Sequence, residues 1–432
     1  MREQLGARTS MELGAFTAPG LARIYLVWTA GLSLFYLASP VISYLVFWDV
    51  LPKISLTLFL SVALVPTFLI RLLLLLSDQL RFASKGLVLS FILLAWISIL
   101  QLLWYPTVST QLGQEDVLST LALTLVVSWV LWFGGESLAF LLVQGPRWKR
   151  MVELAYLCLV CIVLYGLIKG FSMYEFLILA LQNPFSGEFY NYYISLSDSL
   201  AITGLLLMGI NQPNKFYQRA GIYAFTAILM SFTFSRTSLI LFLSVGLASL
   251  WVGSYTKYKH RYLLFLAIGA ILLVLLLTNF FYKDVVYFKG IFYAIERVES
   301  IFAGTDLSFK RRMELLEEGV KGIRQHWLLG YFMNEAVELG KGAYIHNWLS
   351  FWVSYGIGPF LLSLWCIIML LVKCWQMRRR SLLSLSAFGP LLFSCLDIIV
   401  ARYYAWPYIW FAIGFAGVAS GNRLPFYRET VL

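Results

Sequence analysis

Hydrophobic residues occur along this chain in blocks of about 20, separated by short polar segments. A block of that length spans a hydrocarbon core of about 30 Å. Such a block must be helical, because lipid cannot satisfy open backbone groups. The pattern therefore predicts one all-α domain over residues 1–432, a polytopic membrane bundle of about 12 transmembrane helices. The predicted spans are 24–47, 54–76, 87–104, 117–142, 152–172, 194–210, 220–235, 237–253, 263–281, 346–372, 382–400 and 404–420.

Composition and charge agree with this assignment. Of the 432 residues, 60% are hydrophobic and 13% are charged, whereas a soluble domain carries about 25% charged residues. The net charge of +11 is spread over short loops, which favours the positive-inside rule over nucleic-acid binding. If both termini are cytoplasmic, about 20 of the 33 Lys and Arg fall on the inside. We therefore expect both termini in the cytoplasm.

Two segments on the opposite, outer side are long enough to have structure of their own. Residues 173–193 form an aromatic loop, and residues 282–345 form the one sizeable hydrophilic region of the chain. Within the second segment, residues 308–327 have an apolar stripe at helical spacing, with charged residues opposite. This pattern predicts an amphipathic helix on the outer surface. The residues of the stripe are Met313, Leu316, Val320, Ile323 and Trp327.

Three basic residues, Lys310, Arg311 and Arg312, lie near the start of that helix. The helix dipole already makes a helix start positive, so the placement is unfavourable unless an anion is present. A helix start with guanidinium groups suits phosphate. The alternative is contact with lipid headgroups or a solvated face.

Arg236 lies within the apolar run 220–253, which has the length of two helices, so we place it at an outer hairpin. An arginine near membrane depth is costly and is commonly functional or paired. The alternative is an arginine at a helix end that extends its charge to the interface.

His346 is one of three histidines and lies where the large outer loop meets the membrane. This position suits proton transfer from a hydroxyl group, although a lone histidine among aromatic residues is usually structural. Asp397 and Arg402, at the outer end of a neighbouring span, could pair with each other or line the same cavity. No metal-ligand spacing occurs in the sequence, so we expect no metal, and arginine would meet an anionic substrate instead.

Three segments together resemble the bacterial O-antigen ligase and polymerase superfamily. They are FSRTSLILFL around Arg236, RRMELLEEGVKGIRQHWLLG with Arg311, Arg312 and Gly330, and YIHNWLSFWVSYGIGPF around His346. The resemblance covers about residues 230–360, and the first 200 residues match in hydropathy alone. The second segment lacks the usual proline before Gly330.

The resemblance implies an inverting glycosyltransferase of the bacterial inner membrane, without cofactor or metal, that uses undecaprenyl-diphosphate-linked glycans at the periplasmic face. Arg236 and one of Arg311 and Arg312 would bind the diphosphate. His346 would be the general base or would orient the acceptor. The candidate supporting residues are Asn347, Lys310, Asp397 and Arg402.

Within this chemistry, we prefer a polymerase of surface polysaccharide over a ligase that transfers glycan to a lipid A core. The YIHNWLSF segment followed by Tyr355-Gly356 is closer to polymerases, and the aromatic loop 173–193 offers a surface for a sugar chain. Partners would be the lipid-linked donor, a glycan or lipid A core acceptor, membrane lipids and a chain-length regulator, with no nucleic acid. The alternative from another class is a lipid-linked glycan flippase or other secondary transporter.

Overall fold

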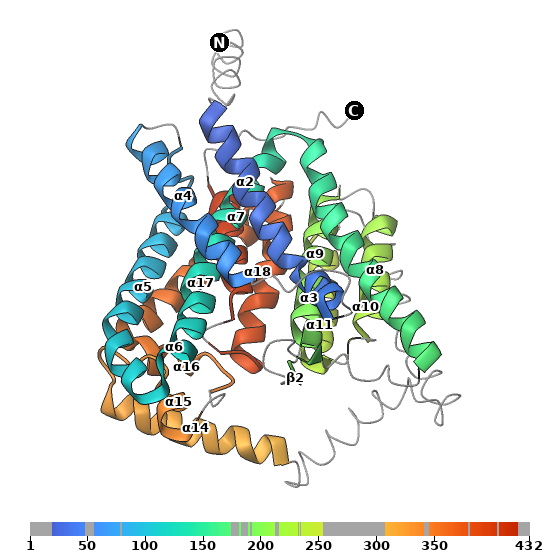
Figure 1. Ribbon diagram of the computed structural model, residues 1–432. Coiled ribbons are helices and arrows are strands. Elements are labelled where there is room, and N and C mark those ends of the chain that lie inside the picture. The colour runs from blue at the N-terminus through green and yellow to red at the C-terminus, as the bar shows by residue number, and fades with distance from the viewer. Residues whose placement is uncertain are drawn as a thin grey trace.

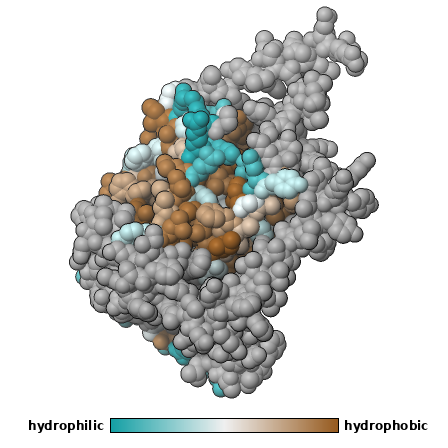
Figure 2. Space-filling model, turned by 90° about the vertical axis from the view of Figure 1, so that its right-hand side faces the viewer, coloured by the Kyte–Doolittle hydropathy of each residue, from teal (hydrophilic) through white to brown (hydrophobic). Residues whose placement is uncertain are grey.

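The computed structural model describes most of the chain, and two views of it are given in Figures 1 and 2. The described residues are 20–47, 56–77, 80–173, 181–182, 189–190, 192–211, 216–231, 233, 235–253, 307–340, 345–378, 381–403 and 406–421. The predicted span 263–281 lies outside them.

The described part of the chain is an all-α bundle with one two-residue strand pair (Figure 1). The helices of the first half are α2 (Gly20–Leu37), α3 (Ser39–Phe47), α4 (Leu56–Leu76), α5 (Lys85–Leu112), α6 (Gln114–Leu121), the π-helical η2 (Ala122–Val127), α7 (Ser128–Gln144), the 3-10 turn η3 (Pro146–Trp148) and α8 (Lys149–Met173). The second half contains α9 (Tyr192–Ile210), α10 (Phe216–Ser231), α11 (Arg236–Gly253), α14 (Leu307–Gln325), α15 (Asn334–Leu339), α16 (Leu349–Tyr355), α17 (Ile357–Met377), α18 (Leu382–Val400) and α19 (Tyr408–Ala419). Strands β1 (Leu181–Gln182) and β2 (Phe189–Tyr190) pair antiparallel within the predicted aromatic loop.

Two helices form the centre of the bundle. Every residue of α19 is buried, and so is every residue of α7 from Ser128 to Leu141. A helix that is apolar on all sides is stable only when other helices surround it. Here α7 packs against both α2 and α19, and α5, α17 and α18 also contact α19.

Six of the described helical segments are long and apolar enough to cross a membrane: α2, most of α4, α5, the continuous α6–η2–α7 segment, α17 and α18. Large apolar side chains on the outside of the bundle are strongly exposed, such as Leu58, Val62, Leu103 and Trp365. On the face that carries α8 and α10, hydrophobic side chains gather beside a hydrophilic patch (Figure 2). An apolar exterior of this kind is suited to lipid.

Two of the predicted spans prove to be broken helices. The segment 24–47 is divided between α2 and α3 at Ala38, two residues before Pro40. The segment 346–372 is also not one helix, because α16 begins at Leu349 and ends at Tyr355, and Gly356 then adopts φ +78. His346 therefore precedes the helices and lies in a loop.

The amphipathic helix predicted over 308–327 is observed as α14, which lies with α15 and α16 at one end of the bundle (Figure 1). Its contact face differs from the predicted apolar stripe. Gly319 and Gly322 face the protein, where a Cβ would lie 1.8 Å from Ile345 and 2.6 Å from the Asn334 amide. Two predicted stripe residues, Met313 and Trp327, are instead 41% and 55% exposed. The small residues let α14 approach the loop before His346 closely, while Leu316, Val320 and Ile323 of the predicted stripe are half-buried.

The backbone that follows α14 crosses the backbone at the junction between α16 and α17. The Gly330 turn forms without a proline before it, and Gly330 has φ +67. Ile357 N–H donates to the Trp327 carbonyl at 3.0 Å, and Tyr331 N–H donates to the Val353 carbonyl at 2.7 Å. A Cβ on Gly356 would lie 2.0 Å from the Leu328 carbonyl oxygen. The crossing therefore requires glycine, and it sets the distance between α14 and the His346 loop.

We predict that Gly356→Ala destabilises the protein by more than the roughly 1–3 kcal/mol of a strained left-handed residue, because the new methyl group also collides with backbone. Gly340→Ala is the matched control, since Gly340 has φ +94 but nothing within 4 Å of its would-be Cβ. Thermal unfolding of the detergent-solubilised variants measures the difference. Equal unfolding midpoints for the two variants would contradict the packing argument.

Candidate functional site

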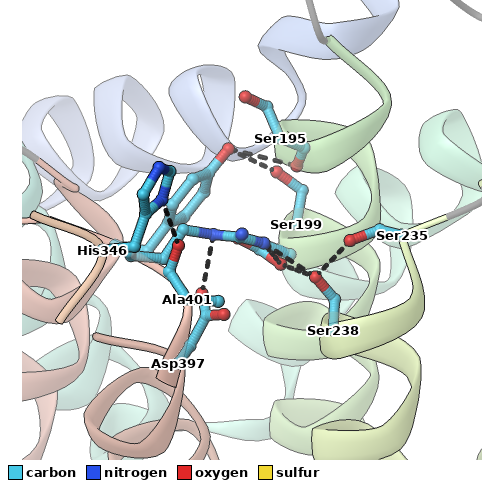
Figure 3. A network of polar contacts seen from close by, with 10 residues as sticks. Ser195, Ser199, Ser235, Ser238, His346, Asp397 and Ala401 are labelled. Atoms are coloured by element: carbon cyan, nitrogen blue, oxygen red, sulfur yellow. Dashed lines mark hydrogen bonds and ion pairs between the residues drawn. The ribbon is translucent and has the colours of Figure 1, made fainter. Parts of the chain in front are cut away.

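Arg402, two residues after the end of α18, is the centre of a buried polar network. Figure 3 labels several residues of this network and its surroundings, among them Ser238 and Asp397. The Arg402 guanidinium meets both carboxylate oxygens of Asp198 on α9 at 3.1–3.2 Å. Its Nε lies 3.2 Å from Asp397 Oδ2 on α18. The Cζ atom of Arg402 lies 4.9 Å from the centre of the Trp406 ring. The predicted pair of Asp397 and Arg402 is thus confirmed, and a second carboxylate joins it. One guanidinium holds α9 and α18 together.

The same network reaches the first turns of α11 and α19. Ser238 on α11 accepts from Arg402 at 2.9 Å and donates to Asp198 at 2.5 Å. The hydroxyl of Ser235 lies 2.6 Å from that of Ser238. Ser235 directly precedes Arg236, which is the first residue of α11, at the predicted hairpin. The network therefore fixes the backbone from which Arg236 extends.

Tyr408, the first residue of α19, joins from the other side. Its hydroxyl lies 3.0 Å from that of Ser199 and donates to the Ser195 carbonyl at 3.2 Å. Ser195 and Ser199 lie on α9 and Ser235 and Ser238 on α11, so the labelled residues of Figure 3 come from helices far apart in sequence. The network thus joins the starts of α9, α11 and α19, and the dipole at a helix start favours a nearby anion.

His346 lies beside the turn that follows α18 (Figure 3). Its Nδ1 is 3.4 Å from the carbonyl oxygen of Ala401, the residue before Arg402. A carbonyl only accepts, so this contact favours a proton on Nδ1 and a lone pair on Nε2. Burial, the charge of Arg312 and that of Arg402 lower the pKa of His346 from 6.5 to about 4, against the opposing effect of the Ala401 carbonyl. The imidazole is neutral at pH 7.

Arg311 and Arg312 have different surroundings in the structure. Arg311 is exposed and forms an ion pair with Glu314 at 2.9 Å on the outer face of α14. Arg312 precedes Leu315 and Gly319 by three and seven residues, and so continues the buried face of the helix toward His346. Its guanidinium is exposed, and its charge acts on His346. Of the two, Arg312 is therefore the one placed to meet an anion beside the histidine.

Asn347 and Lys310 have simpler surroundings. The Asn347 side chain accepts from the backbone N–H of Leu349 at 2.9 Å and so shapes the start of α16. Lys310 is exposed on α14. Asn347 thus supports the loop that presents His346, and Lys310 adds positive charge near Arg312.

Sequence reasoning missed Asp198, which lies inside an apolar run and was assigned to an ordinary span. The signal was present, because Asp198 is flanked by Ser195, Ser197 and Ser199, and a charged residue inside a span commonly has a partner.

Among the residues described, no group of three His, Cys, Asp or Glu side chains could hold a metal ion. No protein-family model and no curated protein matches this chain.

We predict that Asp198→Asn lowers the free energy of unfolding by about 1.5–3 kcal/mol, the range for hydrogen bonds to a charged group. Asp397 still faces Arg402 in that variant. Replacing both carboxylates leaves a buried charge unpaired, so Asp198→Asn with Asp397→Asn should lose roughly 3–5 kcal/mol beyond the single change. Thermal unfolding in detergent, with membrane level as a second readout, measures both.

Ser197→Ala is the control for this series, because Ser197 is buried on the same helix and its hydroxyl has no hydrogen-bond partner among the described residues. It should unfold at nearly the wild-type temperature. The network would not be a stabilising element if Asp198→Asn behaved like Ser197→Ala and the double variant added nothing.

Proposed function

We propose that this chain is an inverting, metal-independent glycosyltransferase of the bacterial inner membrane, of the O-antigen polymerase and ligase type. It joins undecaprenyl-diphosphate-linked glycans at the periplasmic face, and both of its termini are cytoplasmic. The function rests on the sequence resemblance together with the arrangement of the residues that carry it.

The observation that carries the proposal is the convergence of three segments far apart in sequence. His346 lies against the Ala401–Arg402 turn, Arg312 acts on the same imidazole from α14, and the α11 start that bears Arg236 is bonded to Arg402 through Ser238. A neutral histidine beside two cationic positions suits a reaction between a hydroxyl group and a diphosphate ester.

In the proposed reaction, Arg236 and Arg312 hold the diphosphate of the donor. The acceptor hydroxyl, oriented by Nε2 of His346, attacks the anomeric carbon from the side opposite the diphosphate. The new carbon–oxygen bond forms as the bond to the diphosphate oxygen breaks, and the lipid diphosphate leaves with that electron pair. The hydroxyl proton is released as the new bond forms, to Nε2 of His346 or to water. The two guanidinium groups stabilise the negative charge that develops on the leaving group.

The position of α14 supports binding of a membrane-anchored donor. The turn after this helix exposes three large apolar residues, Trp327, Leu328 and Leu329, each 55–57% exposed. Aromatic and aliphatic side chains next to basic residues are typical of segments that lie at a membrane surface. A lipid carrier in the outer leaflet would present its diphosphate at the level of α14, the helix that carries Arg312.

We place the chain among polymerases in preference to ligases, on the character of the YIHNWLSF segment. The acceptor of a polymerase is a second lipid-linked glycan, and a separate chain-length regulator would be its protein partner. The acceptor of a ligase is the lipid A core. Both readings use the same site and the same bond changes.

A secondary transporter is the second candidate, and one observation favours it. Asp198, Asp397 and Arg402 are buried between helices, and transporters place ionisable groups in such positions. The presence of a histidine and an exposed arginine at the end of the bundle favours the transferase. The two candidates differ in whether His346 is needed.

We predict that Arg236→Ala, Arg312→Ala and His346→Ala each reduce glycan joining by about 10²–10³-fold, the scale for removing one stabilising group from a transition state. The measurement is the surface-glycan profile of a deletion strain complemented with each variant, with membrane levels checked. Single repeat units on the core identify a polymerase, and full-length glycan left on the carrier identifies a ligase.

Arg311→Ala is the matched control, because Arg311 neighbours Arg312 in sequence but pairs with Glu314. It should give the wild-type profile. Normal profiles for all three site variants would rule out the proposed site, and a normal His346→Ala profile with impaired delivery of lipid-linked glycan would favour the transporter.

A further inference from the structure

The polar network around Arg402 contains more acidic than basic groups. Asp198 and Asp397 are 0% and 1% exposed, and Arg402 is 7% exposed. Within the described chain, no other basic side chain forms an ion pair with either carboxylate. Two carboxylates and one guanidinium leave a net charge of −1 if both carboxylates are ionised. A buried charge without compensation is costly, so this arrangement calls for one further positive charge.

Asp198 has the hydrogen bonds of an ionised carboxylate. Both of its oxygens accept from the Arg402 guanidinium at 3.1–3.2 Å. Ser238 points into the network from α11 (Figure 3) and donates to Asp198 Oδ1 at 2.5 Å. Asp198 is therefore the carboxylate that balances the charge of the guanidinium.

Asp397 receives no such donors. Its Oδ2 lies 3.2 Å from Arg402 Nε, but the single hydrogen of that nitrogen is donated to Asp198. Neither oxygen of Asp397 meets a hydrogen-bond donor among the described residues. The Asp397 carboxyl is nevertheless in hydrogen-bonding contact with that of Asp198. Because ionised carboxylates only accept, such a contact is favourable when a proton lies between them.

Few titratable groups surround the two carboxyl groups. Of those on the elements packed against α18, Arg402 pairs with both carboxylates and Tyr408 interacts electrostatically with Asp198. None of the others forms a described ion pair with either carboxyl group. The others are Arg236 at the start of α11, Glu136 on α7, and Cys366, Lys373 and Cys374 on α17; His346, in the neighbouring loop, is affected by the charge of Arg402.

We propose that Asp198 and Asp397 together bind one proton, and that this proton site is linked to the binding of the diphosphate. The link to the diphosphate rests on the proposed function. With the proton bound, Asp397 is a carboxylic acid that donates to Asp198, and the network is neutral. When the proton leaves to water, two adjacent carboxylates face one guanidinium, and the network has a net charge of −1.

The network adjoins the proposed diphosphate site. Ser238, which accepts from Arg402, follows Arg236 by two residues. The charge of Arg402 also acts on His346. An added negative charge at this point repels an anion. Loss of the proton should therefore weaken binding of the lipid diphosphate, and by linkage a bound diphosphate should favour retention of the proton.

Infrared difference spectroscopy of the purified full-length protein tests the proton site without the reaction. At neutral pH, wild type minus Asp397→Asn should show a carboxylic acid band that shifts in D₂O. Ser394→Ala is the matched control and should keep the band, because Ser394 is buried one turn before Asp397 and its hydroxyl has no described partner. Absence of the difference band would overturn the proton site. If Asp397→Asn does not accumulate, Asp198→Asn takes its place, since removal of either carboxylate removes the shared proton.

Binding of undecaprenyl diphosphate to the same proteins tests the link, with tryptophan fluorescence as the readout at neutral and alkaline pH. Wild type and Ser394→Ala should bind about 5–150-fold more weakly at alkaline pH, the usual range of coupling between two sites. Asp397→Asn should bind equally at both pH values, because its amide donates to Asp198 and does not ionise. An equal loss of affinity in Asp397→Asn would overturn the link. Failure of wild type to bind the lipid diphosphate at either pH, with the infrared band present, would overturn the proposed function and leave the proton site in place.

Discussion

Burial of one guanidinium group is the constraint on which the arrangement of this site depends. Arg402 lies among helices, where an unpaired charge costs several kcal/mol. It is accommodated because carboxylates from α9 and α18 and a hydroxyl from α11 reach it at 2.9–3.2 Å. These contacts require the ends of three helices to meet at one point. The turn that carries Arg402 then places the Ala401 carbonyl against His346.

This pairing also divides the positive charges into two kinds. Two carboxylates engage Arg402, so it serves to position its neighbours. Arg312 projects from α14 with an exposed side chain, and Arg236 begins α11 next to the network. Under the proposed function, Arg402 with its carboxylate partners forms the rigid base of the site, and Arg312 and Arg236 bind the diphosphate.

The six long apolar helical segments of the described chain could be placed from hydropathy, because spans in an apolar chain are set by length and by the polar segments between them. Hydropathy could not predict which face of a helix contacts the protein or where a helix is interrupted. Gly356 interrupts a continuous apolar run because another backbone crosses there, and α14 turns Gly319 toward the protein because only a small residue fits. Arg311 and Arg312 can be told apart only once the face of α14 that contacts the protein is known. Asp198 was missed because its partner lies about 200 residues away in the chain.

The most direct test of the account is bond formation by the purified protein alone. The protein is reconstituted in vesicles with an undecaprenyl-diphosphate-linked repeat unit, without nucleotide and with a metal chelator, and the products are identified by mass spectrometry. The account predicts lipid-linked glycan lengthened by whole repeat units, with inverted configuration at the new linkage and an equal amount of released undecaprenyl diphosphate. Unchanged repeat units, whether left in place or moved across the bilayer, would contradict it.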